Sequence, residues 1–370
     1  MRPQVLLRER AHRPRTDLMA SGGVGPHAVG ARDREPSPFE VIPLVPSRVA
    51  PGPASLRRGS GREGGACRRE HEHTDGEEQP APHGRDFDDA GVAPSYIDVM
   101  ELDGLGYRGA TAVVVGCSSG IGAATLRILG ELGAQVHAVS VNEPEVPHAT
   151  FHRTDLSQLD EIEATVKALE TIGPIDHLIV ASGIPVTRGA LDILRVNYVG
   201  VRRIVEGLVP LMREGGAIGV VSSSAAGAWE ESLPLLLEIV AITDSEEVMA
   251  WFAAHPDLVA DGYRLSKQLL SAWVAHVAPT LASDRHLRIN CTAPGVTETA
   301  LIEETRAYVP EGFFERYPHP LFGRGASAEE QAWTLVLLNS ALNACVTGST
   351  LFADQGVSAG TRTGSLAPHH

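Results

Sequence analysis

Residues 111–122 read TAVVVGCSSGIG, a short apolar run that leads directly into three closely spaced glycines. The run TAVVV is largely β-branched and has no polar interruption, which is typical of a strand buried on both faces of a sheet. The segment that follows, IGAATLRILGELG, has helical periodicity and ends on Gly133, a residue type that commonly terminates helices. This stretch therefore predicts a strand, a tight turn and a helix in succession.

The three glycines of the turn, Gly116, Gly120 and Gly122, have the spacing G-x-x-x-G-x-G. Glycines at a strand-to-helix turn let the backbone approach a pyrophosphate, and the helix N-terminus then presents free N–H groups to it. The dinucleotide fingerprint G-x-G-x-x-G is spaced differently, and a plain glycine-rich turn is the alternative. The position between a strand and a helix favours a dinucleotide site.

Downstream, strand-like apolar runs alternate with helical segments. The strand candidates are AQVHAVSV, ATFHRTD, DHLIVASG, GAIGVVSSS, HLRINCTAPG and GSTLFAD. The helix candidates are LSQLDEIEATVKALETIG, residues 191–213, a helix through residues 263–277 and SAEEQAWTLVLLNS. Such alternation implies right-handed βαβ units. We therefore predict an α/β fold, a doubly wound Rossmann-type parallel sheet of about seven strands, in a single domain over residues 100–370.

Residues 1–99 have a different composition from the rest of the chain. They hold 14 arginines, no lysine, 12 of the 25 prolines and 12 of the 38 glycines, without sustained apolar periodicity. Such a segment buries too little apolar surface to offset its ordering entropy, so we predict a disordered extension. The same bias would arise if a GC-rich upstream region were translated by mistake. Our hypothesis is that Met100, 16 residues before Gly116, is the true start.

Charge and cysteine content limit the function classes. Residues 100–370 hold 17 basic and 31 acidic side chains, a poor match for nucleic acid or an anionic membrane. MRPQVLLRER lacks the apolar core of a signal peptide, and no apolar run approaches the roughly 20 residues of a membrane span. The four cysteines lie far apart, without metal-ligand spacing or a disulfide framework. We expect a cytoplasmic protein without a metal site.

The stretch ADGYRLSKQLL, residues 260–270, contains Tyr263 and Lys267, one of only two lysines in the chain. A spacing of four places both side chains on one face of a helix. A nearby ammonium favours the ionised form of a phenol and would lower its pKa. A solvated helix face is the alternative, because this pattern is a weak signal when taken alone.

Over residues 107–360 these motifs, in their order, resemble the classical short-chain dehydrogenase/reductase family. GCSSGIG matches the cofactor loop, with Val115 where the family usually has Thr, and ASG at 181–183 stands where Asn-Ala-Gly is usual. The second departure is expected to loosen a sheet contact without removing chemistry. The resemblance implies an NAD or NADP site formed by Gly116, Ser118, Ser119, Gly120, Ile121, Gly122, Ser140, Asp155, Leu156, Ala181, Ser182, Gly183, Tyr263, Lys267, Pro294, Gly295, Val296 and Thr299.

The resemblance also implies a catalytic set. Asn197 in RVNYVG and Ser224, the last of three consecutive serines, match family positions that precede the Tyr and the Lys. By the family pattern, Tyr263 exchanges the proton of the substrate hydroxyl and Ser224 hydrogen-bonds the substrate oxygen. Asn197 keeps a water that connects Lys267 to solvent. A homo-oligomer, dimer or tetramer, is expected as well.

An insert at 225–260 separates Ser224 from Tyr263. GAWEESLPLLLEI, AWFAAHP and INCTAPG look like coniferyl-alcohol dehydrogenases, and bacterial 3α-hydroxysteroid dehydrogenase/carbonyl reductases have a comparable insert here. Residues 225–262 hold eight acidic side chains and no Lys or Arg. A solvated helical hairpin or a subunit contact is at least as good an interpretation as a direct substrate role.

Residues 301–322 are rich in aromatic side chains and broken by Pro and Gly, as in a mobile substrate lid. The aromatic residues are Tyr308, Phe313, Phe314, Tyr317 and Phe322. A small satellite core is the alternative. Together with Trp229 and Trp251 of the insert, this segment favours an apolar, ring-bearing substrate.

These observations predict an oxidoreductase that transfers a hydride between NAD(P) and an apolar, aromatic or allylic, alcohol or carbonyl. Hydroxysteroid or alicyclic carbonyl turnover is an alternative, as is a catalytically silent NAD(P)-binding module, although such a module would not need all four catalytic positions. Ser140 stands where NAD-specific relatives have an acid, and no arginine stands beside it in the sequence or just before Gly120. Cofactor preference is left open.

Overall fold

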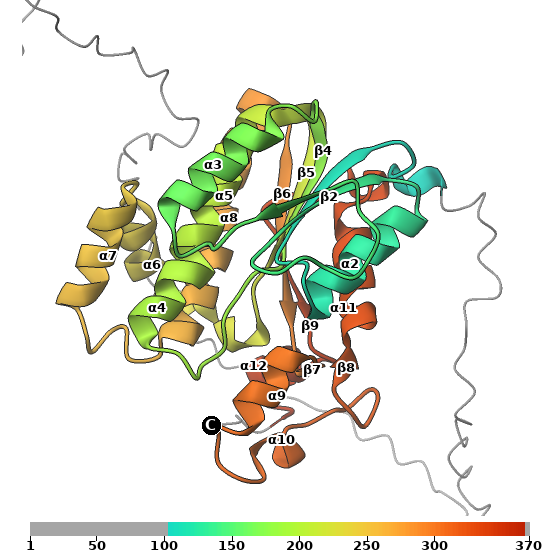
Figure 1. Ribbon diagram of the computed structural model, residues 1–370. Coiled ribbons are helices and arrows are strands. Elements are labelled where there is room, and N and C mark those ends of the chain that lie inside the picture. Colours follow the sequence, from blue (N-terminus) through green and yellow to red (C-terminus); the bar gives the residue numbers. More distant parts are fainter. Residues whose placement is uncertain (1–102, 367–370) are drawn as a thin grey trace, which may run out of the picture. The chain divides into compact units, whose positions relative to one another are not determined.

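The computed structural model describes residues 103–366, and the expectations for residues 1–99 lie outside this range. A seven-stranded parallel sheet in the order β3-β2-β1-β4-β5-β6-β9 confirms the predicted doubly wound fold (Figure 1). Its strands are β1 (Thr111–Val115), β2 (Gln135–Ser140), β3 (Thr150–Arg153), β4 (Ile175–Val180), β5 (Met212–Val221), β6 (Arg288–Pro294) and β9 (Thr350–Ala353).

Helices cover both faces of the sheet (Figure 1). On one face lie α2 (Gly120–Glu131) and α11 (Ala328–Asn339), and on the other lie α3 (Leu159–Leu169), α5 (Val201–Leu208) and α8 (Gly262–Arg285). Each layer has its own apolar core. Leu269, Trp273 and Val277, which recur every four residues along α8, are buried in the apolar core of that layer.

The expectation of one continuous helix over residues 191–213 is wrong. The segment consists of α4 (Ala190–Leu194), a π-helical turn (Arg195–Gly200), α5 and a 3₁₀ turn (Val209–Leu211). A Cβ on Gly200 would lie 2.2 Å from the carbonyl oxygen of Leu156, so this residue type permits the close approach of the helix. Pro210 cannot donate a backbone hydrogen bond, and β5 starts two residues later.

The insert forms two helices, α6 (Leu233–Val240) and α7 (Ser245–Ala254). The buried guanidinium of Arg202, on α5, donates hydrogen bonds to the carbonyls of Val240 and Ile242, each at 3.0 Å. Arg202 is also paired with Glu206 at 2.6 Å, so its charge is compensated inside the protein. The end of α6 is therefore fastened to the sheet-covering layer by a buried cation.

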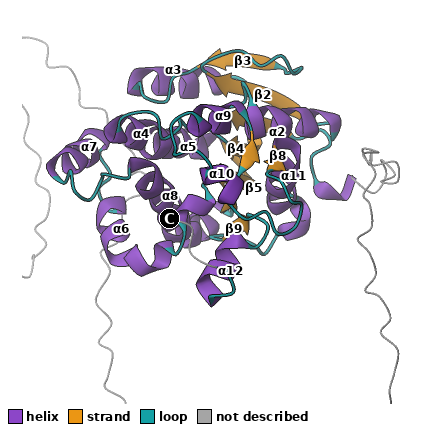
Figure 2. Ribbon diagram, turned by 90° about the horizontal axis from the view of Figure 1, so that it is seen from below, coloured by secondary structure: helices purple, strands orange, loops and turns teal. Residues whose placement is uncertain are grey.

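Several short elements follow β6. They are β7 (Thr297–Glu298), α9 (Ala300–Arg306), α10 (Phe313–Arg316), β8 (Ala326–Ser327) and α12 (Val357–Thr363). The strands β7 and β8 pair with each other in a separate two-stranded sheet. Figure 2 shows the molecule from below the view of Figure 1, from the side where the strands end and where α9 and α10 lie. None of the helices within residues 103–366 is long and apolar enough to cross a membrane.

Candidate active site

A cleft of about 1270 Å³ lies along the carboxyl ends of the parallel strands. Its lining includes residues at or just after the ends of six strands, among them Val115, Ser140, Thr154, Ala181, Val221 and Pro294. This is the edge at which open α/β sheets bind ligands. Of the residues predicted to hold the cofactor, all except Gly122 line this cleft.

Two positions around the turn between β1 and α2, Gly116 and Gly122, have no room for a side chain. Gly116 has φ +81°, and a Cβ there would lie 2.6 Å from Cα of Ser182. A Cβ on Gly122 would lie 2.0 Å from the carbonyl oxygen of Gly116, so Gly122 packs beneath the turn rather than in the cleft. The first turn of α2 has no side-chain cap from Ser119. Its N–H groups therefore face the cleft as a cradle that fits a pyrophosphate.

Tyr263 and Lys267 lie at the start of α8, where the carboxylate of Asp261 caps the helix by accepting from the N–H of Arg264 at 2.9 Å. The Nζ atom of Lys267 is 5.7 Å from the centroid of the Tyr263 ring. It is buried and donates to the carbonyl of Val221 at 3.1 Å. The helical spacing thus brings the phenol and the ammonium together, as the sequence predicts.

Asn197, on the π-helical turn, is fully buried and lies beside Lys267 without lining the cleft. Its side-chain amide makes two hydrogen bonds to the backbone of Ile184, at 2.7 and 3.1 Å. A Cβ on Gly183 would lie 3.5 Å from Asn197 Oδ1 and 3.6 Å from Lys267 Nζ. Asn197 therefore fixes the chain that leaves β4, next to the lysine.

The three consecutive serines have three different surroundings. Ser222 is buried and donates to the carbonyl of Lys267 at 2.9 Å. Ser223 hydrogen-bonds the Tyr263 phenol, whereas Ser224 hydrogen-bonds the phenol of Tyr317. Sequence reasoning named Ser224 and missed both Ser223 and the role of Tyr317. A run of identical residues does not reveal which hydroxyl faces the tyrosine.

Burial dominates the electrostatics of this group. It raises the pKa of Tyr263, while the hydrogen bond from Ser223 lowers that pKa and the Asp261 carboxylate raises it further. Burial also lowers the pKa of Lys267 to about 8. The sequence predicts a lowered phenol pKa. In the chain without a cofactor, removal of the phenolate from water outweighs the nearby hydrogen-bond donor.

The aromatic segment covers one side of the cleft. Phe313, Phe314 and Tyr317 line it, whereas Tyr308 and Phe322 are exposed. The expectation that the insert tryptophans add to this apolar wall is wrong. Trp229 is buried in the core beneath the cleft and Trp251 packs against that core with its ring stacked on His255.

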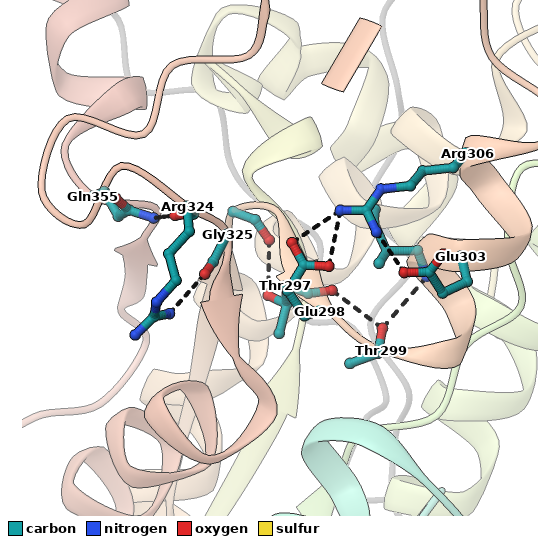
Figure 3. Close-up of polar contacts among 10 residues, drawn as sticks. Thr297, Glu298, Thr299, Glu303, Arg306, Arg324, Gly325 and Gln355 are labelled. Atoms are coloured by element: carbon teal, nitrogen blue, oxygen red, sulfur yellow. Dashed lines mark hydrogen bonds and ion pairs between the residues drawn. The ribbon is translucent and has the colours of Figure 1, made fainter. Parts of the chain in front are cut away.

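Polar contacts hold both ends of this segment (Figure 3). At the beginning, Arg306 binds the carboxylates of Glu298 and Glu303. At the end, the side-chain oxygen of Gln355 accepts from the N–H groups of residues 321 and 322, and its nitrogen donates to the carbonyl of Arg324 at 2.8 Å.

A further contact crosses the cleft. Glu304, on α9, accepts a hydrogen bond from Thr187 Oγ1 at 2.5 Å and lies 3.5 Å from Arg188 Nη2. Thr187 and Arg188 belong to the segment between β4 and α4, which lines the opposite wall. The aromatic segment 301–322 and that wall are thereby joined.

Comparisons with known proteins agree with this geometry. Residues 110–233 match the family model described as short chain dehydrogenase, and residues 249–358 match one described as enoyl-(acyl carrier protein) reductase. A coniferyl-alcohol dehydrogenase of a Pseudomonas species is 29% identical over 66% of this chain and 95% of its own length. A cis-4-hydroxycyclohexanecarboxylate dehydrogenase of Sinomonas cyclohexanicum is also 29% identical, over 67% of this chain and 96% of its own.

Hydroxysteroid enzymes are similar to this chain both in sequence and in structure. The 3-alpha-hydroxysteroid dehydrogenase/carbonyl reductase of Comamonas testosteroni is 26% identical over 67% of this chain and 96% of its own. The crystal structure of a Pseudomonas 3-alpha-hydroxysteroid dehydrogenase complexed with NADH superposes with a TM-score of 0.60 at 27% identity, covering 69% of this chain and 99% of that one. With its glycine cradle, its Tyr–Lys pair and its sheet order, the chain belongs to the short-chain dehydrogenase/reductase family of NAD(P)-dependent oxidoreductases.

Proposed function

We propose that this chain interconverts an apolar, ring-bearing alcohol and the matching aldehyde or ketone. The observation that supports this most directly is the meeting of Tyr263, Lys267 and Ser223 in one cleft that Phe313 and Phe314 border. Several relatives are named for ring-bearing alcohols: coniferyl alcohol, a hydroxysteroid and a hydroxycyclohexanecarboxylate.

The cofactor site follows from the cradle described above. The loop from Gly116 to Ile121 would hold the pyrophosphate, with Asp155 and Leu156 toward the adenine and residues 294–299 toward the nicotinamide. When bound, the nicotinamide accepts or supplies the hydride. The protein's own contribution is to orient the substrate oxygen and to move its proton.

Under this proposal Tyr263 exchanges that proton. In oxidation the phenolate accepts the proton of the substrate hydroxyl, and in reduction the neutral phenol donates it to the forming alcohol. Ser223 orients the phenol, and Ser224 is available to the substrate oxygen once Tyr317 shares or releases its hydroxyl. Lys267 places a buried cation beside the ring, held by the carbonyl of Val221. Cytoplasmic location and assembly as a dimer or tetramer stay predictions.

The test is a substrate screen with the purified full chain. Cinnamyl-type alcohols, 3α-hydroxysteroids and substituted cyclohexanols are offered with NAD⁺ or NADP⁺, and the matching carbonyls with the reduced cofactors. Formation or loss of reduced nicotinamide is followed by absorbance. We expect turnover of at least one ring-bearing class and none by the Tyr263→Phe variant. Cofactor binding by calorimetry without turnover of any ring-bearing alcohol or carbonyl would favour the silent binding module instead.

A further inference from the structure

The substrate end of the cleft carries two arginines that no carboxylate neutralises. Arg264 directly follows Tyr263 on α8, and Arg362 lies in the last turn of α12. Both side chains are exposed and line the cleft. Within residues 103–366 neither makes an ion pair, whereas the other arginines that line the cleft, Arg188 and Arg195, are paired with glutamates. Unpaired cations are unexpected in a chain with a net charge of −15.

The two guanidinium groups meet at Gly227, three residues after Ser224. Arg362 Nη2 donates to the carbonyl of Gly227 at 3.1 Å, and Arg264 Nη2 lies 3.9 Å from the point where a Cβ on Gly227 would stand. That Cβ would meet nothing else within 4 Å outside its chain neighbours, so the space beside the arginines is open. Gly227 has φ +54°, a conformation that side-chain-bearing residues rarely adopt.

Arg362 is held in position before any ligand arrives. Its guanidinium carbon lies 4.4 Å from the centroid of the Phe352 ring, on β9, and one N–H group is used on Gly227. A guanidinium has five N–H donors in a planar fork that matches a carboxylate. Donors therefore remain for an anion, and little conformational freedom is lost when they are used.

We propose that Arg264 and Arg362 form an anion subsite beside Gly227, and that the substrate is a ring-bearing alcohol or carbonyl that also carries a carboxylate. This inference rests on the proposed function, because it names the substrate class of the same site. The cofactor's pyrophosphate does not account for the pair, since its cradle is the turn at Gly116–Gly122 and the arginines lie beyond the catalytic serines. A ring would separate the carboxylate from the hydroxyl that reacts at Tyr263.

Acidic residues at this end work against an anion to different degrees. The Asp261 carboxylate accepts from the backbone N–H of Arg264 and is directed at the helix start. Glu231 is exposed, lines the same end of the cleft and has no ion-pair partner among the described residues. Removal of the Glu231 charge should therefore strengthen the preference for a carboxylate.

The experiment uses the full chain and matched substrate pairs. The pairs are 4-(hydroxymethyl)benzoate with its methyl ester, and 4-hydroxycyclohexanecarboxylate with its methyl ester. We expect kcat/KM to favour the acid by about tenfold or more at low ionic strength and by less in salt, as for an exposed charge-assisted contact. Arg264→Gln and Arg362→Gln should each lower the acid-to-ester ratio by roughly tenfold, and Glu231→Gln should raise it. Arg127→Gln is the control, because Arg127 is a half-buried arginine of α2, paired with Glu131 and Glu329, that does not line the cleft.

Two outcomes would overturn the anion subsite without affecting the proposed function. One is an equal kcat/KM of the wild type for acid and ester, and the other is an acid-to-ester ratio that in both arginine variants stays within twofold of the wild-type ratio. If no pair is turned over, the proposed function fails for these alcohols, and equilibrium binding decides about the subsite. Calorimetry with NAD⁺ present would then compare benzoate with benzamide. Benzoate binding that is lost in the arginine variants supports the subsite, and equal or absent binding of the two probes rejects it.

Discussion

The hydroxyl of Tyr263 is the group whose removal separates cofactor binding from chemistry. Tyr263→Phe keeps the ring but removes the group that exchanges the substrate proton. We expect kcat to fall at least about a hundredfold, the low end of general acid–base contributions, while cofactor affinity is retained. Steady-state rates and a cofactor titration measure both quantities. Tyr308→Phe is the matched control, because the Tyr308 side chain is exposed outside the cleft.

Lys267→Arg extends the same test to the cation. The buried Nζ fits beneath the tyrosine and donates to Val221, and a planar guanidinium would not fit that space. This variant should also be severely impaired. If Tyr263→Phe kept more than a tenth of the wild-type kcat while chemistry limits the rate, the proposed mechanism would be wrong.

The dependence of kcat/KM on pH distinguishes the role of Ser223 from that of Ser224. Because burial raises the pKa of Tyr263, the phenol keeps its proton at neutral pH, so reduction is favoured there and oxidation increases as the pH rises through that pKa. Ser223→Ala removes a hydrogen bond that lowers the pKa, so the oxidation profile should move to higher pH. Ser224→Ala should lower kcat without that movement. Profiles of kcat/KM against pH for the three proteins test this, and an unmoved Ser223→Ala profile contradicts the assignment.

The sequence predicted single residues only where spacing carries geometric information. Tyr263 and Lys267 are four residues apart in a helix, so their contact could be foreseen. Ser223 could not be distinguished from Ser224, because the backbone turns sharply into a 3₁₀ helix at this point and sends adjacent side chains in different directions. Arg362 became relevant only when the fold brought α12 to Gly227.

Among the secondary-structure elements, those with strong periodicity were predicted and short ones were not. The strand β1, the turn and α2 follow directly from TAVVVGCSSGIG, and α11 begins at a capping box formed by Ser327 and Glu330. By contrast, β7 and β8 have two residues each, too few for any alternation to be visible. The π-helical turn at Asn197, over Arg195–Gly200, leaves no periodic signal in the sequence.

We expect the choice between NAD and NADP to depend on the residue at the end of β2. Ser140 stands where an acid would bind the ribose hydroxyls and repel a 2′-phosphate. Its neighbour in β3 is Arg153, a cation that the sequence did not place here, but Arg153 is bound by Glu161 and does not line the cleft. We expect kcat/KM for the two cofactors to agree within about tenfold, or ~1.4 kcal/mol. A preference above about a hundredfold in either direction contradicts this, and Ser140→Asp should shift the ratio toward NAD.

At the scale of the whole molecule, the family models match residues 110–233 and 249–358, and residues 103–366 contain the seven-stranded sheet and the cleft. We therefore predict that a chain of residues 100–370 folds and keeps full activity. Thermal unfolding and kcat/KM, compared with those of the full chain, measure this. A lower melting temperature or a loss of activity would show that residues 1–99 contribute to the folded protein.

The doubly wound parallel sheet, its approximate number of strands and the cofactor class could all be predicted, because they depend on strand alternation and on glycines at one turn. The wall at the substrate end could be predicted only in part: Phe313, Phe314 and Tyr317 of the aromatic segment do line the cleft. This wall is assembled from α9, α10, α12 and the serine segment. Some of these elements are distant in sequence, and only the packing of the folded chain brings them together. Trp229 and Trp251 illustrate this. Aromatic residues in the insert suggested a substrate pocket, but Trp229 lies in the apolar core and Trp251 packs against it.

The bridge from Glu304 to Thr187 and Arg188 has a kinetic consequence. A cofactor that leaves the cleft past this contact must break it first, so we expect departure of the product cofactor to be slower than hydride transfer. Substrate deuterated at the reacting carbon should then give almost no isotope effect on kcat in the wild type. Glu304→Gln weakens the bridge. We expect a higher kcat for this variant and a measurable isotope effect on kcat. Glu303→Gln, on the same helix, is the comparison. A full isotope effect on kcat in the wild type would mean that hydride transfer, and not release of the product cofactor, limits the rate.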